Sequence, residues 1–425
     1  MKSKSKLVLD LLCACESPNM LWIEPDGSWP IVWERAKGTR VWDADGKEYL
    51  DLTAAFGVAA AGHANPRVVA AGQRQLSLLP HAMGDVHPHK PKAELARELS
   101  RLTFERWSGG RASGKTIFNN SGFEAVEAAL KTAMLATGRG GIVAFTGGYH
   151  GLGYGALNAT HRPFFRASFQ SQLGRFGRFA PFPKSGDDLP PLRMRLDKLM
   201  AGRQCGAVVV EPIQARGGIN VPPPDFLPML RALCDQHGAL LVLNEIYTGF
   251  GRTGTWFACE DSGVTPDLIC LGKALTGGFP LSVCVGRADL MDAAWPPSTG
   301  EAIHTSTFQG NPVGCAMALA QIAEIRSRKL PRRAAESGRF LLEALRAEIA
   351  RPGLRVEARG RGLLAGLEIK NDGGLAMRAI KEMLRRGFIL LPEGARGNVI
   401  SFTPPLTITK AELAAAVSAL KDVLA

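Results

Sequence analysis

The chain has 425 residues, of which 46% are hydrophobic and 21% are charged, and its formal net charge is +12. This composition excludes a disordered, collagen-like or disulfide-built protein, and no apolar stretch reaches the ~18 residues that a membrane span needs. The eight cysteines lack CxxC or metal-ligand spacing, so we expect reduced thiols, a cytoplasmic location and no metal site.

The first part of the chain contains a helix and a hairpin. Residues 1–15 predict an N-terminal helix and not a signal peptide, because Asp10 interrupts their apolar run. Residues 41–50 are two extended runs around Asp45-Gly46, which is typical of a β-hairpin.

The middle of the chain alternates between strands and helices. From about residue 95 to 325, short β-rich apolar runs alternate with helical patterns, which indicates βαβ units and a mostly parallel sheet covered on both faces. The predicted strands are 115–118, 141–146, 207–211, 239–244, 268–271 and 282–286, and the predicted helices include 124–137, 226–236 and 312–328. Asp225 is placed to cap the second of these helices, and Gly238 follows its end.

The last part of the chain mixes helices with extended segments. The predicted helices are 336–350, 376–386 and 410–424, the last one opened by a Thr409-x-x-Glu412 capping box, and residues 366–370 and 398–402 are extended. We therefore expect an α/β fold with a large domain over residues 76–328 and a smaller α+β domain. The smaller domain is built from residues 1–75 and 329–425.

Lys273 is the strongest single chemical feature. It directly follows the apolar strand 268–271 and precedes the Gly-Gly-Phe-Pro turn at 277–280. The carboxyl edge of a parallel sheet opens into a crevice, where desolvation lowers the pKa of an amine and makes it a nucleophile or Schiff-base former. A lone lysine at a strand end is more often simply exposed to solvent. The neighbouring motifs therefore decide whether Lys273 has a chemical role.

Two further motifs supply groups suited to a phosphorylated ligand. Ser121-x-x-Glu124 has the form of a capping box at a helix start, where free N–H groups bind phosphate, although ordinary helix capping explains it equally well. The run 147–151, Gly-Gly-Tyr-His-Gly, places an aromatic ring and an imidazole on a turn.

The order of these motifs resembles the class III aminotransferases, which are pyridoxal-phosphate enzymes of fold type I. The resemblance extends from Trp42 to Leu406, and its motifs are Ser-Gly-x-Glu-Ala at 121–125, Gly-x-Tyr-His-Gly at 147–151, Glu-Pro-Ile-Gln at 211–214, Asn-Glu-Ile-x-Thr-Gly-Phe-Gly-Arg-Thr-Gly at 244–254, Gly-Lys-Ala at 272–274 and Thr-Ser-Thr-Phe-x-Gly-Asn-Pro at 305–312. It implies a central mostly parallel sheet with helices on both faces, a smaller α+β domain, and pyridoxal 5′-phosphate as cofactor.

The resemblance also implies roles for single residues. Lys273 would form a Schiff base with the cofactor and then shuttle a proton between the substrate Cα and the cofactor C4′. Ser121 and Gly122 would hold the phosphate, while Phe123 stands where the family commonly has Ser or Thr. Thr307 resembles the residue that reaches the phosphate of the neighbouring subunit, which implies a homodimer or a higher homo-oligomer.

The remaining cofactor positions implied by the resemblance surround the pyridine ring. Tyr149 would stack on the ring, Glu211 would lie on the strand beside it, and His150 and Ile246 complete the set. The family's carboxylate that bonds the pyridine nitrogen is here replaced by Asn244. An amide supplies no compensating charge, so we expect weaker stabilisation of the carbanion at Cα.

Asn244 can make either of two contacts with the pyridine nitrogen, and three explanations for the replacement of the carboxylate remain open. Its NH₂ can donate to an unprotonated ring nitrogen, or its oxygen can accept from a protonated one. The replacement fits a variant tuned to a different reaction, a slow transaminase, or a deliberate substitution.

The substrate end of the site departs from the family as well. Members that act on α-amino acids often carry Arg where this chain has Ser401, because Arg clamps the α-carboxylate. Its absence resembles ω-amino-acid and amine transaminases, in which an upstream Arg swings in; Arg396 is a candidate for that role or a solvated loop residue. Phe56, Trp22 and Tyr247 line a substrate pocket or belong to the framework.

We therefore predict an aminotransferase that moves an amino group from an amine or amino-acid donor to an oxo acceptor, of ω-amino-acid or amine type. An epimerase or aminomutase on the same scaffold, and a pyridoxal-phosphate-binding protein of low turnover, remain alternatives. The expected partners are small molecules and a second subunit.

The basic residues are concentrated in two stretches outside these motifs. Residues 161–203 hold nine Lys and Arg against three Asp and Glu, and residues 326–361 hold eleven against four. Neither stretch resembles a nucleic-acid-binding module, so we expect solvated basic surfaces that steer anions, and no nucleic-acid or membrane partner.

Overall fold

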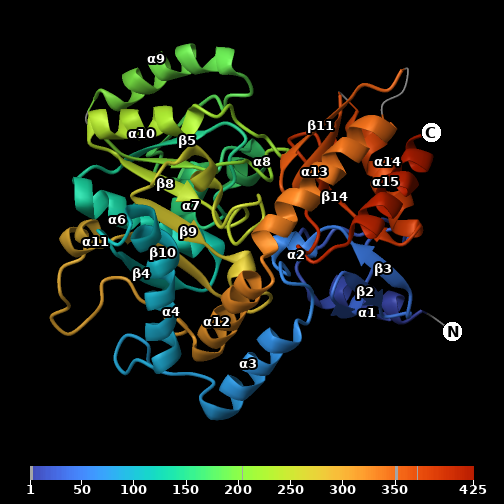
Figure 1. The fold of residues 1–425 in the computed structure, drawn as a ribbon, viewed down its shortest axis with the longest axis horizontal. Helices are drawn as coiled ribbons and strands as arrows, with labels where there is room; N and C mark the ends of the chain where they lie inside the picture. Colours follow the sequence, from blue (N-terminus) through green and yellow to red (C-terminus); the bar gives the residue numbers. More distant parts are fainter. Residues whose placement is uncertain (1–2, 203, 350–352, 371) are drawn as a thin grey trace.

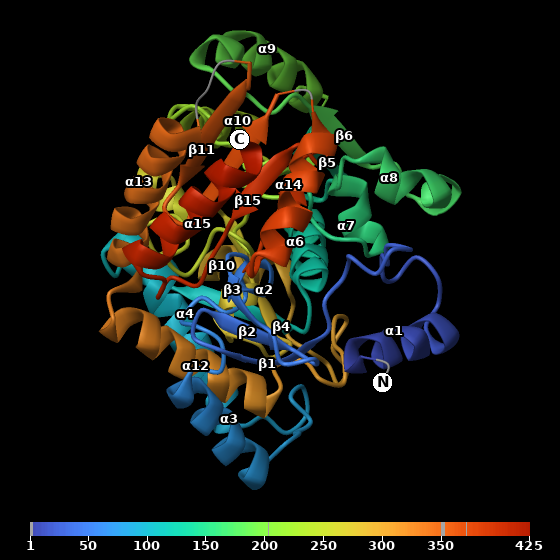
Figure 2. The ribbon, with the colours of Figure 1, turned by 90° about the vertical axis from the view of Figure 1, so that its right-hand side faces the viewer.

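The computed structural model describes residues 3–202, 204–349, 353–370 and 372–425 (Figure 1). The predicted N-terminal helix is confirmed as α1 (Lys4–Cys15), which begins where the Ser3 side chain accepts a hydrogen bond from the Lys6 N–H. None of its residues is buried, and it lies at the edge of the molecule (Figure 2). Within the described ranges, every helix is too short or too polar to cross a bilayer.

A seven-stranded sheet forms the centre of the larger part of the molecule. Its strands are β4 (Gly114–Asn119), β5 (Gly141–Phe145), β6 (Gly177–Ala180), β7 (Cys205–Val210), β8 (Leu240–Asn244), β9 (Leu268–Leu271) and β10 (Ser282–Arg287), in the order β4-β10-β9-β8-β7-β5-β6. Among these seven strands, β10 alone runs in the opposite direction, antiparallel to β4 and β9 on either side. The predicted mostly parallel sheet is confirmed, and β6 is the strand that the prediction missed.

Both faces of this sheet are buried. In β7, Ala207 and Val209 pack in a cluster with α6 (Gly122–Thr137), whereas Val208 and Val210 belong to the larger core cluster on the opposite face. The larger cluster includes residues of α9 (Leu189–Met200) and α10 (Phe226–His237). Because alternate side chains point to opposite faces, burial on both sides requires the continuous apolar runs seen in the sequence.

Further helices surround the large sheet. The helix α12 (Pro312–Ser327) packs against α3 (Pro66–Leu78) and α4 (Lys90–Ser100) at the bottom of the view in Figure 1. Shorter α-helices of this part are α5 (Arg106–Ser108), α7 (Tyr154–Ala159), α8 (Pro163–Arg166) and α11 (Ala288–Ala294), whereas α2 (Ala54–Gly57) belongs to the segment before residue 75.

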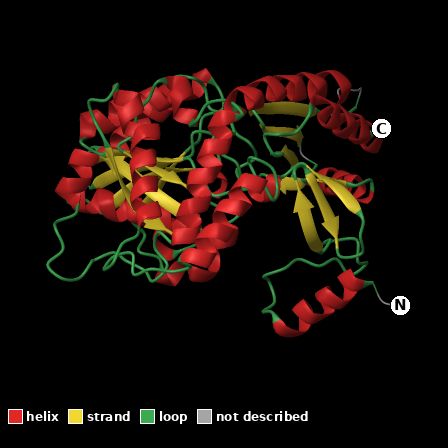
Figure 3. Ribbon diagram, turned by 60° about the horizontal axis from the view of Figure 1, so that its bottom comes forward, coloured by secondary structure: helices red, strands yellow, loops and turns green. Residues whose placement is uncertain are grey.

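The two ends of the chain meet in one small sheet. It contains β1 (Trp33–Lys37), β2 (Arg40–Asp43), β3 (Glu48–Asp51) and β13 (Phe388–Ile389), in that order, and β13 is parallel to β3. The predicted hairpin is confirmed as β2 and β3, with Gly46 at φ 91° in the turn. Figure 3 shows this second group of strands apart from the central sheet.

A second small sheet belongs to the C-terminal part alone. It orders β11 (Val356–Arg361), β12 (Leu364–Ile369), β15 (Val399–Phe402) and β14 (Leu391–Glu393), beside helices α13 (Leu330–Ile349), α14 (Gly373–Arg385) and α15 (Lys410–Leu424). The predicted capping box of Thr409 and Glu412 opens α15. We propose a division into residues 1–75, 76–328 and 329–425, although α3 crosses the boundary at 75 and packs on α12.

Some local predictions are wrong in detail. Asp225 stands at the start of α10, but its side chain makes no capping hydrogen bond, because its backbone (φ −80°, ψ −1°) is already helical where a capping residue is extended. Gly238 ends α10 at φ 61°, as expected. The helix predicted at 336–350 begins at Leu330, and residue 350 lies outside the described residues.

Candidate active site

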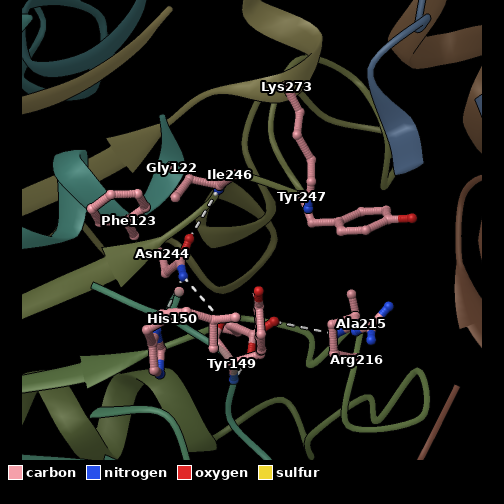
Figure 4. Close-up of a pocket in the computed structure, with 13 residues that line it drawn as sticks. Gly122, Phe123, Tyr149, His150, Ala215, Arg216, Asn244, Ile246, Tyr247 and Lys273 are labelled. Carbon is pink, nitrogen blue, oxygen red and sulfur yellow. Dashed lines mark hydrogen bonds between the residues drawn. The ribbon is translucent and has the colours of Figure 1, made fainter. Parts of the chain in front are cut away.

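A cavity of about 430 Å³ opens at the carboxyl ends of the parallel strands (Figure 4). It is lined by Gly122, Phe123, Tyr149, His150, Gly151, Leu152, Glu211, Ala215, Arg216, Asn244, Ile246, Tyr247 and Lys273. These residues lie at or after the ends of β4, β5, β7, β8 and β9. Ligands of open α/β sheets bind at this edge, and the volume is in the usual range of about 300–1,000 Å³ for ligand pockets.

Lys273 projects into this cavity from the turn after β9. Its backbone has φ 45°, a left-handed conformation that costs about 1–2 kcal/mol for a residue with a Cβ. Its Nζ lies 3.7 Å from the centroid of the Tyr247 ring. Burial lowers the pKa of the amine to about 8, although the nearby carboxylates of Glu211 and Glu393 oppose the shift. A larger share of this amine than of an exposed lysine is therefore neutral and nucleophilic near physiological pH.

Glu211 is the carboxylate of the cavity wall. Its two oxygens accept hydrogen bonds from the backbone N–H groups of Tyr149 (2.9 Å) and Ala215 (3.2 Å). Burial raises its pKa to about 7, while these two bonds and the charge of Lys273 act in the opposite direction. The negative charge of Glu211 in turn favours the protonated form of Lys273.

Asn244 is held in one orientation by two backbone groups. Its Oδ1 accepts from the N–H of Ile246 (3.2 Å), and its Nδ2 donates to the carbonyl of Tyr149 (3.4 Å). The Nδ2 also lies 3.0 Å from Nδ1 of His150, which therefore accepts and leaves the ring proton on Nε2. Burial lowers the pKa of His150 to about 4, so this imidazole is neutral.

This orientation bears on the contact that Asn244 can offer to a pyridine nitrogen. Both amide hydrogens are engaged, one by the Tyr149 carbonyl and one by His150, and only Oδ1 keeps a spare lone pair. Of the two contacts that the sequence leaves open, the structure favours the oxygen, which accepts from a protonated ring without an ionic contribution.

The N-terminus of α6 faces the cavity. The Glu124 carboxylate accepts from the backbone N–H groups of Asn120 (2.9 Å) and Ser121 (2.7 Å) and from the Ser121 hydroxyl (3.0 Å). No acceptor among the described residues bonds the N–H groups of Gly122 and Phe123. Free N–H groups at the positive end of a helix bind phosphate.

The cavity therefore fits pyridoxal 5′-phosphate on features of this chain. The Lys273 amine suits its aldehyde, the start of α6 suits its phosphate, and Tyr149 supplies an aromatic ring. A Cβ at Gly122 would lie 3.1 Å from Cδ1 of Ile246, so a larger residue would crowd the wall at that point.

The other predicted site residues lie outside the cavity wall. Ser121 is half-buried beside Gly122, whereas Thr307 is exposed in the segment between α11 and α12. The neighbour of Thr307, Ser306, accepts a hydrogen bond from Asn120 (3.3 Å), so this segment touches the loop before α6.

The predicted substrate residues are not brought together. Phe56 is 49% exposed and lines a separate apolar cavity of about 330 Å³. Ser401 is buried, and its hydroxyl donates to the carbonyl of Leu391 (3.0 Å). Arg396 is exposed in the turn after β14 and is not among the described residues that line the main cavity.

Sequence reasoning missed two charged residues at this site. Arg216 lines the cavity from the loop after β7, and Glu393 ends β14 next to it. A cation five positions after Glu211, and an acid that follows the apolar Leu390-Leu391-Pro392, are the signals that indicate them. Tyr247, considered as either pocket or framework, lines the cavity.

The lowered pKa of Lys273 predicts how its reactivity depends on pH. In cofactor-free protein, labelling by trinitrobenzenesulfonate, followed by peptide mass spectrometry, rises through pH of about 8 and levels off above it, because only the neutral amine reacts. In unfolded protein the midpoint moves to the ordinary lysine value of 10.5. A native midpoint equal to the unfolded one would contradict the burial of this amine.

Comparisons with known proteins agree with this geometry. The model of the family "Aminotransferase class-III" matches residues 23–424. The chain is 39% identical to a putrescine aminotransferase of Pectobacterium atrosepticum, covering 93% of this chain and 82% of the relative. It is 38% identical to a 5-aminovalerate aminotransferase of Pseudomonas aeruginosa, covering 90% and 91%.

A solved transaminase structure has the same fold as this chain. An amine transaminase from an uncultivated Pseudomonas species, in its form with bound pyridoxal phosphate, has a TM-score of 0.87 at 30% identity and covers 96% of this chain and 97% of its own. The buried lysine at the end of β9, the helix start beside it and these matches lead to one conclusion: the chain belongs to the class III aminotransferases and is a pyridoxal-phosphate-dependent transaminase of fold type I.

Proposed function

We propose that this aminotransferase takes its amino group from primary amines or ω-amino acids and passes it to an oxo acid. The observation that carries this proposal is Ser401, which stands where relatives acting on α-amino acids often have an arginine and whose hydroxyl is engaged by the Leu391 carbonyl. The substrates in the names of its relatives, putrescine and 5-aminovalerate, have an amine at a chain end and support the same class.

Different residues of the chain carry out different parts of the proposed transamination. Pyridoxal phosphate, when bound, supplies the electron sink that stabilises negative charge at the substrate carbon. Lys273 would hold the cofactor through its Nζ, and the same Nζ, whose pKa is lowered by burial, would accept and return the proton of that carbon. The start of α6 holds the phosphate, and Glu211 fixes the Tyr149 backbone.

The donor class is tested in the first half-reaction. Holoenzyme is mixed with putrescine, 5-aminovalerate or L-alanine, and the loss of the visible cofactor absorbance is followed. We expect the terminal amines to react at least about tenfold faster than L-alanine, because no arginine at 401 binds an α-carboxylate. Faster reaction of L-alanine would contradict the assignment, and absorbance that returns without loss of the amino group would indicate epimerisation or aminomutation.

Asn244 is expected to limit the rate. Replacing Asn244→Asp supplies a charge that keeps the ring nitrogen protonated, so we expect the first half-reaction to accelerate at least about tenfold, equal to about 1.4 kcal/mol of barrier. Stopped-flow absorbance measures it, with Asn244→Ala as the matched variant that removes the amide and adds no charge. An unchanged rate in Asn244→Asp would show that proton removal does not depend on this contact.

We also propose a homodimer in which Thr307 reaches the cofactor phosphate of the partner subunit. Thr307 is exposed and does not line the cavity of its own chain. Large apolar side chains around it are exposed, namely Ile303 (69%), Phe308 (59%), Met83 (54%) and Val86 (64%). Apolar surface of this kind is typical of contacts between proteins.

Subunit complementation tests the shared site. Lys273→Ala and Thr307→Arg subunits, each inactive alone, are co-expressed with different tags. A mixed dimer has one site with both residues intact, so random pairing restores about a quarter of the wild-type sites. The wild-type protein and a mixture of separately purified variants are the controls. If Thr307→Arg alone is fully active, or if the mixed dimers stay inactive, Thr307 does not serve the partner's site.

We propose a cytoplasmic location for the enzyme. The eight cysteines are free thiols in the structure, and six of them are buried. Thiols that stay unpaired are typical of a reducing compartment, which supports this proposal.

A further inference from the structure

Arg216 and Glu393 form an ion pair without a hydrogen bond at the side of the cavity. The Nε of Arg216 lies 3.6 Å from Oε2 of Glu393, and the two side chains are 31% and 3% exposed. Both atoms are buried and lack a hydrogen-bond partner among the described residues. Leaving buried polar atoms unpaired is unfavourable, so a ligand that bonds one of them is stabilised in return.

Arg216 is the member of the pair that faces a ligand. It lines the same cavity as Lys273, whereas Glu393 does not. Its guanidinium carbon lies 5.7 Å from the centroid of the Tyr149 ring, which also lines the cavity (Figure 4). The N–H of Gly394 donates to the Arg216 carbonyl (3.2 Å), and this bond holds the two loops together. A ligand in the cavity therefore meets the guanidinium before the carboxylate.

The charges around the pair favour an anion. Burial raises the pKa of Glu393 to about 7, while the positive charges of Arg216, Lys273 and Arg162 act in the opposite direction. The charge of Arg162 acts on Arg216 as well, so two guanidinium groups adjoin one buried acid. The entry of a carboxylate balances this excess of positive charge.

The other candidates for a carboxylate contact are less well placed. The hydroxyl of Ser401 already donates a hydrogen bond to the Leu391 carbonyl, and Arg396 is exposed outside the cavity wall. Among the arginines of the described chain, Arg216 is the one that lines the cavity. Its planar guanidinium can donate two parallel hydrogen bonds to a carboxylate.

We propose that Arg216 binds the carboxylate of the acceptor oxo acid and of ω-amino-acid donors, and that Glu393 is its counter-ion when the bound substrate has no carboxylate. This inference rests on the proposed transamination of amines and ω-amino acids. An amine without a carboxylate leaves the Arg216–Glu393 pair intact, so the guanidinium is not left without a negative partner. One cavity thereby accepts substrates with and without a terminal carboxylate.

The test compares acceptors that differ in their carboxylate. With putrescine as donor, KM and kcat are measured for pyruvate and for propanal in the wild type and in Arg216→Met. We expect the KM for pyruvate to rise at least about tenfold more than the KM for propanal, and any loss in the putrescine half-reaction is shared by both acceptors and cancels in this comparison. Equal losses for both acceptors, or no change for either, would overturn the inference.

Three further variants sharpen the test. Arg193→Met removes an exposed arginine of α9 and controls for the loss of one positive charge. Arg396→Met tests the competing loop arginine, and a pyruvate-specific loss in this variant but not in Arg216→Met would overturn the inference. Glu393→Gln should leave the KM for pyruvate equal or lower, because the competitor for the guanidinium is gone; a rise confined to putrescine would show instead that Glu393 binds the distal ammonium.

Binding without turnover separates failure of this inference from failure of the proposed function. Calorimetric titration of the holoenzyme with glutarate, a dicarboxylate that carries no amine, should give binding in the wild type and in Arg193→Met but not in Arg216→Met. Glutarate binding that persists in Arg216→Met overturns the carboxylate site. A wild type that binds glutarate through Arg216 but transaminates none of the amines retains the carboxylate site and overturns only the proposed function.

Discussion

The candidate active site depends on the removal of one amine from water. Lys273 follows β9, whose four residues are fully buried, and a left-handed backbone at Lys273 directs the side chain into the cavity. Burial lowers the pKa of the amine to about 8, so a larger fraction of it is the neutral nucleophile than in an exposed lysine. The sheet with two covered faces supplies this environment, because its strand ends are surrounded by protein on both sides.

The same burial requires charges to be grouped. Glu211 and Glu393 lower the cost of placing a positive charge at Lys273. Arg216 lowers the cost of placing a negative charge at Glu393. Each of these charges would be costly alone, whereas together with Arg162 they offset one another in part and leave an excess of positive charge. A substrate carboxylate joins an arrangement that already tolerates negative charge.

The cavity is also tied to both ends of the chain. The hydroxyl of Tyr247, whose ring contacts Lys273, lies 3.3 Å from Oγ1 of Thr403, and Thr403 donates to the carbonyl of Thr53 (3.1 Å). Arg252 is buried and donates to the carbonyl of Leu363 (3.0 Å). The Tyr247 ring beside the amine is thus tied through Thr403 to Thr53, which brings both ends of the chain to the cavity.

Local signals predict a large part of this molecule, and long-range contacts account for what they miss. The strands of the large sheet and the turn that carries Lys273 follow from apolar runs and glycines, so the sequence predicts them well. Arg216 and Glu393 escaped prediction because their pairing joins the loop after β7 to the end of β14, which no local pattern reveals. Asp225 shows the reverse case, since a residue type suited to capping does not form the bond when its backbone is already helical.

The pairing of β3 with β13 has a consequence for how the protein is made. Strand β3 pairs on one side with β2, where Leu50 faces Arg40, and on the other side with β13, where Leu50 and Asp51 face Phe388 and Ile389, close to the end of the chain. When the ribosome has synthesised the strands of the large sheet, it has not yet synthesised β13, β14 or Thr403. The first small sheet therefore stays incomplete until this last part of the chain is made. The contact of Thr403 with Tyr247 and the pairing of β13 with β3 are therefore completed only after every strand of the large sheet has been synthesised.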